Sequence, residues 1–393
     1  MTGSDEAPVT PNQYSVALAA ARQRPGFVDL ICTNFHQCGL RYDPERIREI
    51  AHRYLSSHPV YDPDPLGAPD LRRAICGFYG AAGIRANPEQ VVITASASES
   101  YSHMFTSIVT RGGQVLLPRP GYPLFEEIAE RSGVECRYYD QHADRGWAID
   151  PDEIEQIVEP ETAAIVVISP NNPTGHIATD DEFIAIGAIC RRHDLLLIHD
   201  EVFSEYRFDP VHLGRLPRPA NLCQEVDVVT LNGASKLLVC PDLKVSWMMA
   251  SGPHAPDLVE RLSIANDLFL SASPLNQHLV ARMLEDGMGE TGRIVTEVGR
   301  RRARLIDQLE QCAGLHLHPP QGGIHAVIRV AGAVIGRGLD DESISVGLLE
   351  QCGVAAHPGY LYGINDETAL IVSYLARPAV IQAGAERLCS FVR

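Results

Sequence analysis

The sequence predicts an α/β protein with a large, doubly wound, mostly parallel-sheet domain and a small α+β domain. Between residues 90 and 251, short apolar runs alternate with amphipathic stretches. This alternation is typical of strands that are buried on both faces of a sheet and covered by helices. After residue 312 the pattern changes to a mixture of fewer strands and helices. With 393 residues, 45% of them hydrophobic, the chain is long enough for two domains.

The predicted elements follow from the apolar runs and from helix start signals. In the large domain, strands are expected at 91–94, 115–118, 164–169, 195–200, 226–231 and 246–250. Helices that begin near Ser, Asp or Pro are expected at 98–109, 122–132, 152–158, 180–193 and 255–267. A long helical region at 273–312 precedes strands at 325–330 and 369–375 and helices at 341–352 and from 378 onward. The expected division is an N-terminal arm at 1–25, a large domain at 50–275, and a small domain from 26–49 and 276–393.

Composition and charge argue against several classes of protein. A net charge of −17 disfavours binding of nucleic acid or anionic membranes through a broad surface. No apolar run approaches the ~20 residues that span a bilayer, and residues 1–8 lack the regions of a signal peptide. We therefore expect a cytoplasmic protein. Ten cysteines without a repeated short spacing predict free thiols rather than disulfides, and no metal site is expected.

The two lysines of the chain, Lys236 and Lys244, both lie in the segment 233–244, whereas the other 31 of the 33 basic residues are arginines. A guanidinium stays protonated and cannot replace a lysine that must form a Schiff base. Codon bias toward arginine explains why lysine is scarce but not where the two lysines lie. The pattern predicts that Lys236 anchors a carbonyl cofactor covalently.

Polar residues follow four of the predicted strands. Ligands of doubly wound sheets bind beyond the carboxyl ends of the strands. The segment 94–98 ends a strand and opens a helix, whose first amides are suited to a phosphate. The segment 169–175 follows a second strand, Asp200 ends a third, and Ser235 with Lys236 follows a fourth. Taken singly, 169–175 is also consistent with a plain turn, and Asp200 with a helix cap or an ion pair.

Together these motifs resemble the fold-type I pyridoxal-phosphate enzymes, specifically the class I/II aminotransferase family. The resemblance spans roughly residues 28 to 390 and rests on the order and spacing of the motifs. They are Asn172-Pro-Thr-Gly, Asp200-Glu-Val-Phe, Ser235-Lys236 with a base at Lys244, Pro120-Gly-Tyr-Pro, and Tyr61 followed by Gly67 and Leu71-Arg-Arg.

The resemblance implies a role for each matching residue. Lys236 would form the Schiff base with pyridoxal 5'-phosphate and then act as general base at Cα. Asp200 would keep the pyridine nitrogen protonated. The implied cofactor-binding residues are Ser96, Ala97, Ser98, Tyr122, Asn172, Asp200, Phe203, Ser235, Lys244 and Tyr61, the last reaching the partner subunit of a homodimer with shared active sites. The implied substrate-binding residues are Asn34, Phe35, His325 and Tyr360.

Several positions depart from the family pattern. Ile371 stands where the family usually has the arginine that clamps the substrate carboxylate. Phe203 replaces a tyrosine that would bond the phenolate oxygen, and Lys244 replaces an arginine. Gly233 stands where serine is common, and Ser246 where glycine is usual. These changes predict a specialised enzyme rather than a housekeeping aspartate or aromatic transaminase.

The predicted function is that of a pyridoxal-phosphate enzyme acting at the α-amino group or Cα of an amino acid or a derivative. Transamination in a specialised biosynthetic pathway is the leading hypothesis. The alternative is β- or γ-elimination, replacement or cyclisation in secondary metabolism, as in capreomycidine synthase-like or C–S lyase-like relatives. A third hypothesis, a non-catalytic sensor fused to a DNA-binding domain, is disfavoured because no basic region precedes residue 28.

Overall fold

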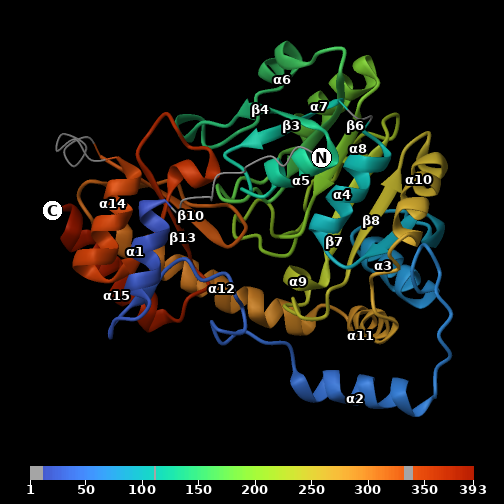
Figure 1. Ribbon diagram of the computed structural model, residues 1–393, viewed down its shortest axis with the longest axis horizontal. Helices are drawn as coiled ribbons and strands as arrows, with labels where there is room; N and C mark the ends of the chain where they lie inside the picture. The colour runs from blue at the N-terminus through green and yellow to red at the C-terminus, as the bar shows by residue number, and fades with distance from the viewer. Residues whose placement is uncertain (1–11, 110–111, 332–339) are drawn as a thin grey trace, which may run out of the picture. The chain divides into compact units, whose positions relative to one another are not determined.

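The computed structural model describes residues 12–109, 112–331 and 340–393 (Figure 1). The chain forms two compact units. The larger contains residues 34–300 and 319–325, and the smaller contains residues up to Thr33, 301–318 and 326–393. The larger unit thus includes 34–49 and 276–300, which the sequence analysis assigned to the small domain. Residues 1–11 of the predicted arm lie outside the described residues.

The larger unit is built on a seven-stranded sheet with the order β2-β8-β7-β6-β5-β3-β4. Only β8 runs antiparallel to its neighbours, so the predicted mostly parallel sheet is confirmed. The edge strand β4 was not predicted, because its residues are largely polar. The strands are β2 (Val91–Thr94), β3 (Gln114–Arg119), β4 (Glu135–Asp140), β5 (Thr162–Ile168), β6 (Leu196–Asp200), β7 (Val228–Gly233) and β8 (Ser246–Ser251).

Helices bury both faces of this sheet, as expected for a doubly wound fold. Val115 and Leu117 belong to the apolar core that includes side chains of α4 and α10. Leu116, between them, belongs to the core of the opposite face with side chains of α6 and α7. The alternation follows from the period of two along a strand. These helices and their neighbour are α4 (Ala97–Ser107), α5 (Phe125–Ser132), α6 (Pro151–Ile157), α7 (Asp180–His193) and α10 (Ala255–Asp267).

A third apolar core lies beside β2 and β8, where α3 and α11 pack against one another. The predicted helical region 273–312 contains two helices, and Gly287, with φ +83°, lies in the break between them. A glycine in the left-handed region is a common helix terminator. The remaining helices of this unit are α2 (Pro44–Ser56), α3 (Pro69–Ala81), α8 (Pro219–Leu222), α9 (Ala234–Leu237) and α11 (Pro274–Glu285), and α12 (Gly289–Leu309) runs on into the smaller unit.

The smaller unit contains a four-stranded sheet with the order β12-β13-β10-β9 and a separate parallel pair, β1 and β11. Its helices are α1 (Gln13–Ala21), α14 (Asp341–Gly347) and α15 (Pro378–Val392). Its strands are β1 (Val28–Asp29), β9 (Leu315–Leu317), β10 (His325–Val330), β11 (Val354–Ala355), β12 (His357–Pro358) and β13 (Ala369–Ser373). Within the described ranges, no helix has the length and apolar character needed to cross a membrane.

Candidate active site at the carboxyl edge of the sheet

Four neighbouring strands bring the predicted site positions to one end and one face of the large sheet. Thr94, at the end of β2, pairs with Ser246 of β8, which in turn pairs with Gly233 at the end of β7. Asp200 ends β6, the next strand. By the alternation of side chains, all four positions face the side that α4 covers. The strand ends singled out in the sequence therefore meet where ligands of doubly wound sheets bind.

Lys236 lies on the short helix α9, directly after β7. Its amine nitrogen lies 5.6 Å from the ring centroid of Phe35 and 6.0 Å from that of Phe203. Burial lowers the pKa of the Lys236 amine, because the charged form is poorly solvated there. Among the described residues, the amine has neither a hydrogen bond nor an ion pair. The hydroxyl of Tyr206 donates to the Lys236 backbone carbonyl at 3.0 Å, which holds the helix that carries the amine.

Asp200 is buried and lacks a cationic partner among the described residues. Its Oδ1 accepts the backbone N–H of Val202 at 3.1 Å, and its Oδ2 accepts the hydroxyl of Tyr101 at 3.0 Å. Burial raises the pKa of Asp200 to about 6 although both hydrogen bonds favour the ionised form. A buried carboxylate is costly without a counter-charge, so this site favours a ligand that brings a cation.

Tyr122 lies just after β3, and 38% of its side-chain surface is exposed. Burial, and secondarily the Asp200 carboxylate, raise the pKa of Tyr122. Its ring packs edge-on against Phe125 at 5.6 Å between centroids, and Phe125 packs in the same way against Tyr101 at 4.8 Å. One aromatic cluster therefore positions both Tyr122 and the hydroxyl that bonds Asp200.

The loop 169–175 follows β5, and its first residue bonds the backbone of Asp200. The Ser169 backbone N–H donates to the Asp200 carbonyl at 3.0 Å. The Oδ1 atom of Asn172 is buried without a hydrogen-bond partner within the described residues. The Gly322 N–H donates to the Gly175 carbonyl at 2.8 Å, so the segment that leads to His325 packs against this loop. His325 itself is buried.

The N-terminus of α4 carries the predicted phosphate-binding residues. Ser96 caps the helix, and its hydroxyl accepts the Glu99 N–H at 3.1 Å. Ala97 and Ser98 form the first turn, whose amides have no partner inside the helix. On the β7–β8 side, Ser235 is half-buried, and Lys244 is exposed without an ion pair in the described part of the chain.

Tyr61 and Asn34 belong to the larger unit, and Tyr360 belongs to the smaller one. Tyr61 is 66% exposed. Asn34 is exposed, and its side chain accepts the Gln37 N–H at 3.2 Å. Tyr360 belongs to the smaller unit, where its hydroxyl accepts from Asn12 at 2.9 Å.

The departures at Gly233 and Ser246 are coupled by the register of β7 and β8. A Cβ atom at Gly233 would lie 2.3 Å from the Ser246 hydroxyl oxygen and 3.0 Å from its Cβ atom. The space between these two positions holds one serine side chain, and in this protein that side chain belongs to Ser246 of β8. The Ser246 hydroxyl has no hydrogen-bond partner within the described ranges and faces the side of α4.

We expect Gly233→Ser to destabilise the protein by about 1 to 3 kcal/mol, the usual cost of overpacking a filled core. Adding Ser246→Gly should restore most of that stability, since the two positions share one space. Urea unfolding of the single and double variants measures the coupling. Gly80→Ser is the control, because a Cβ atom at Gly80 meets nothing within 4 Å. If the double variant were no more stable than Gly233→Ser, the two positions would not share one space.

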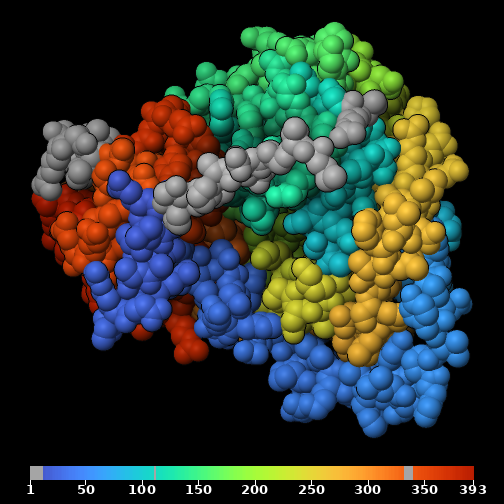
Figure 2. All heavy atoms as spheres, viewed as in Figure 1, coloured from blue at the N-terminus to red at the C-terminus, as the bar shows by residue number. Residues whose placement is uncertain are grey.

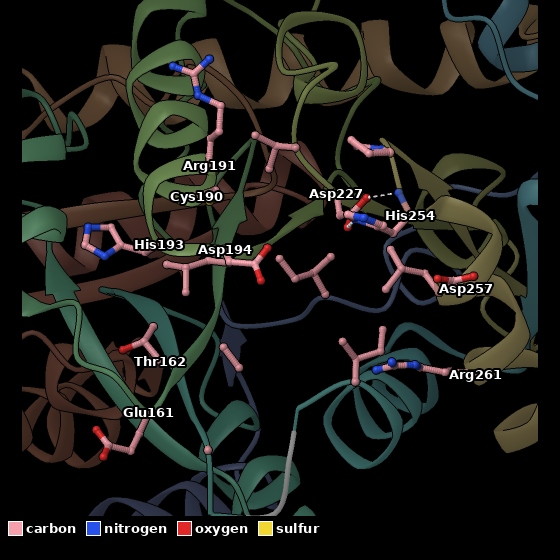
Figure 3. A pocket seen from close by; sticks show the side chains of 18 of the residues that line it. Glu161, Thr162, Cys190, Arg191, His193, Asp194, Asp227, His254, Asp257 and Arg261 are labelled. Carbon is pink, nitrogen blue, oxygen red and sulfur yellow. Dashed lines mark hydrogen bonds and ion pairs between the residues drawn. The ribbon is translucent and has the colours of Figure 1, made fainter.

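A cavity of about 820 Å³ opens at the opposite edge of the sheet, where the parallel strands begin (Figure 3). Thr162 and Leu196, the first residues of β5 and β6, line it. Two pairs of its charged groups bond each other: His254 bonds Asp227 at 2.9 Å, and Arg191 bonds Glu225 at 2.6 Å. Lys236 and Asp200 lie at the other ends of the strands, so this cavity is separate from the candidate site.

Two residues of the site were not found in the sequence. Tyr101 lies on the face of α4 that is turned to Asp200, and Tyr206 follows Phe203 by three residues and bonds the backbone of Lys236. Both are among 13 tyrosines without a motif of their own. The available signal for Tyr101 was its helical position three residues after the expected phosphate-binding Ser98.

Comparison with known proteins agrees with this geometry. Residues 30–388 match the family model for aminotransferases of class I and II. Glutamate-pyruvate aminotransferase AlaA of Escherichia coli K12 is 28% identical over 268 residues, which are 67% of this chain and 65% of the relative. The match thus spans slightly less than two thirds of that protein. Aspartate aminotransferase of Geobacillus stearothermophilus is 26% identical over 356 residues, covering 89% of this chain and 88% of the relative.

The fold is also that of solved aminotransferases. The alanine aminotransferase from Pyrococcus furiosus superposes with a TM-score of 0.90, covering 100% of this chain and 99% of that one, at 21% sequence identity. The fold-type I prediction is confirmed by this likeness. Because the family model extends over nearly the whole chain and several of the residues that carry the resemblance meet at the carboxyl ends of the strands, this protein belongs to the class I and II aminotransferase family.

Proposed function

We propose that this protein is a cytoplasmic, homodimeric, pyridoxal 5'-phosphate-dependent enzyme that acts at the α-amino group and Cα of an amino acid or an amino-acid derivative. Transamination in a specialised biosynthetic pathway is the favoured reaction. The observation that carries the proposal is a pair of uncompensated groups beyond adjacent strands: the half-buried amine of Lys236, on the helix that follows β7, and the buried carboxylate of Asp200, at the end of β6.

The chemistry of the unpaired groups fits this cofactor. The amine of Lys236 has a lowered pKa, as needed to condense with an aldehyde. Asp200 lacks a cation, which a protonated ring nitrogen would supply. The open first turn of α4, together with Ser235, Lys244 and Ser246, offers donors and charge for a phosphate.

Each of these residues has a distinct part in the reaction. When bound, the cofactor supplies the electron sink that labilises a bond at Cα. Lys236 would hold the cofactor covalently, and its amine, once free, would accept the proton from Cα. Asp200 keeps a proton on the ring nitrogen, and the apolar rings of Phe35 and Phe203 exclude water from the amine.

Two observations support elimination, replacement or cyclisation as a second candidate. Phe203 presents a ring to Lys236 and lacks the hydroxyl that would bond the cofactor phenolate. Ile371, on β13, is fully buried and pairs with His357, so that position supplies no arginine for a substrate carboxylate. Both changes alter groups that would control the course of the reaction, whereas Lys236 and Asp200 are retained.

Exposed apolar side chains support a homodimer. Val60 is 88% exposed and Tyr61 66% exposed, and Leu268 and Phe269, after α10, are 78% and 67% exposed. The two segments adjoin on the surface of the larger unit, blue beside gold in Figure 2, where the Asn266 side-chain amide donates to the Pro65 carbonyl at 2.6 Å. Exposed apolar patches of this kind mark interaction surfaces. A sedimentation mass equal to one chain would contradict the dimer.

The deciding experiment mixes the purified holoenzyme with a panel of amino acids and no keto-acid acceptor. Mass spectrometry then follows both cofactor and substrate. Transamination should convert the cofactor to pyridoxamine phosphate with formation of the matching keto acid. Substrate consumption with the aldehyde form of the cofactor retained would establish the second candidate instead. An active panel member should lose all reaction in Lys236→Arg, which keeps the charge but not the nucleophile, and absence of reaction with any amine would overturn the proposal.

A further inference from the structure

Tyr101 bonds the carboxylate that is proposed to meet the cofactor ring. Its hydroxyl donates to Asp200 Oδ2 at 3.0 Å, and its side chain is 2% exposed. It lies in the second turn of α4, the helix whose first turn is proposed to bind the phosphate. One rigid helix thus extends from the phosphate end of the site to the carboxylate that faces the ring.

The environment of Tyr101 fixes its hydroxyl in place. Phe125 packs edge-on against the ring at 4.8 Å, and Phe105 packs against it at 5.7 Å. Burial raises the pKa of Tyr101 well above its ordinary value, and the nearby Asp200 carboxylate adds to the rise. The phenol therefore stays protonated at neutral pH and remains a donor to the carboxylate.

The two donors to Asp200 come from different elements and bond different oxygens. The Val202 N–H bonds Oδ1 at 3.1 Å, and Tyr101 bonds Oδ2. Two donors on separate oxygens define the plane of the carboxylate and leave a lone pair on each oxygen for a ligand. Neither donor carries a charge, so the burial of this anion is still uncompensated.

Resting on the proposed function, we propose that Tyr101 is a positioning residue that holds the Asp200 carboxylate ionised and oriented toward the cationic ring nitrogen of the bound cofactor. The role is specific to that nitrogen. Tyr101 should therefore strengthen the binding of a cofactor that carries this nitrogen, and it should have no effect on the binding of one in which carbon replaces the nitrogen.

The test compares the affinity of apoprotein for pyridoxal 5'-phosphate and for its deaza analogue, which has carbon in place of the ring nitrogen. Tyr101→Phe removes a single oxygen atom and keeps the packing of the ring. The variant should bind pyridoxal phosphate roughly tenfold more weakly, as expected for a lost hydrogen bond to a charged group, and should bind the analogue as the parent does. In an Asp200→Asn background, Tyr101→Phe should no longer change the ratio of the two affinities.

A matched control is available in Tyr139. It is also almost fully buried, at 1% exposure, and donates to a backbone carbonyl, that of Val166, at 2.8 Å. Tyr139→Phe should leave the ratio of affinities unchanged. If Tyr101→Phe weakened the binding of both ligands equally, or weakened the binding of neither, the positioning role would be overturned. Failure of the parent apoprotein to form a borohydride-reducible link with either aldehyde would instead overturn the proposed function.

Discussion

Replacing Lys236 with alanine should leave the fold intact and abolish covalent attachment of pyridoxal phosphate. The other lysine, Lys244, is exposed and lies eight residues away, beyond the α9 helix that presents the Lys236 amine to Phe35 and Phe203. Turnover should fall by at least roughly a thousandfold, since the covalent anchor and the general base are lost together.

Borohydride reduction followed by peptide mass spectrometry measures the attachment, because a reduced imine stays on the lysine that formed it. Lys244→Ala is the matched control: it removes the same type of side chain and should retain the link at Lys236, with cofactor affinity weakened through the phosphate alone. Far-ultraviolet circular dichroism should be unchanged in both variants. A reducible link that persists in Lys236→Ala would refute the anchor assignment.

Much of the large unit could be predicted because its strands are continuous apolar runs. The runs at 91–94 and 246–250 correspond closely to β2 and β8, and the helices at 180–193 and 255–267 begin and end as predicted. Thr179 shows why: its side chain accepts the Glu182 N–H, and Glu182 bonds back, so a capping box fixes the start of α7. The edge strand β4 lacks this signal, since an edge strand need not be apolar on both faces.

The candidate site was predictable only where a local motif marks it. Lys236, Asp200 and Asn172 stand in recognisable strings at strand ends, and the sheet order brings those strands together. Tyr101 has no such string, because its role depends on the face that α4 turns to β6. The coupling of Gly233 to Ser246 likewise required the register of two strands, although each departure was visible singly. Roles that depend on a partner subunit, as proposed for Tyr61, stay predictions.

Asp200→Asn should stabilise the apoprotein above pH 6 and at the same time lower the turnover of the holoenzyme. Burial raises the pKa of Asp200 to about 6 from an ordinary value of 3.8. The folded state therefore keeps its proton to a higher pH than the unfolded state does, and stability of the apoprotein falls as pH rises from about 4 to 6. At about 1.4 kcal/mol per pKa unit, the cost above pH 6 is roughly 3 kcal/mol. A neutral asparagine avoids that cost.

Cofactor loading should reverse this order of stability. A cationic ring nitrogen compensates the carboxylate of the parent, whereas the asparagine variant gains nothing from that charge and no longer holds the ring proton. Its turnover should fall by about a hundredfold or more, equivalent to roughly 3 kcal/mol of lost transition-state stabilisation. Thermal unfolding of the parent and the variant at pH 5 and pH 7.5, with and without pyridoxal phosphate, gives four stabilities for each protein, and the amino-acid panel gives turnover. An apoprotein variant less stable than the parent at pH 7.5 would contradict the uncompensated carboxylate, and near-normal turnover would contradict its part in the reaction.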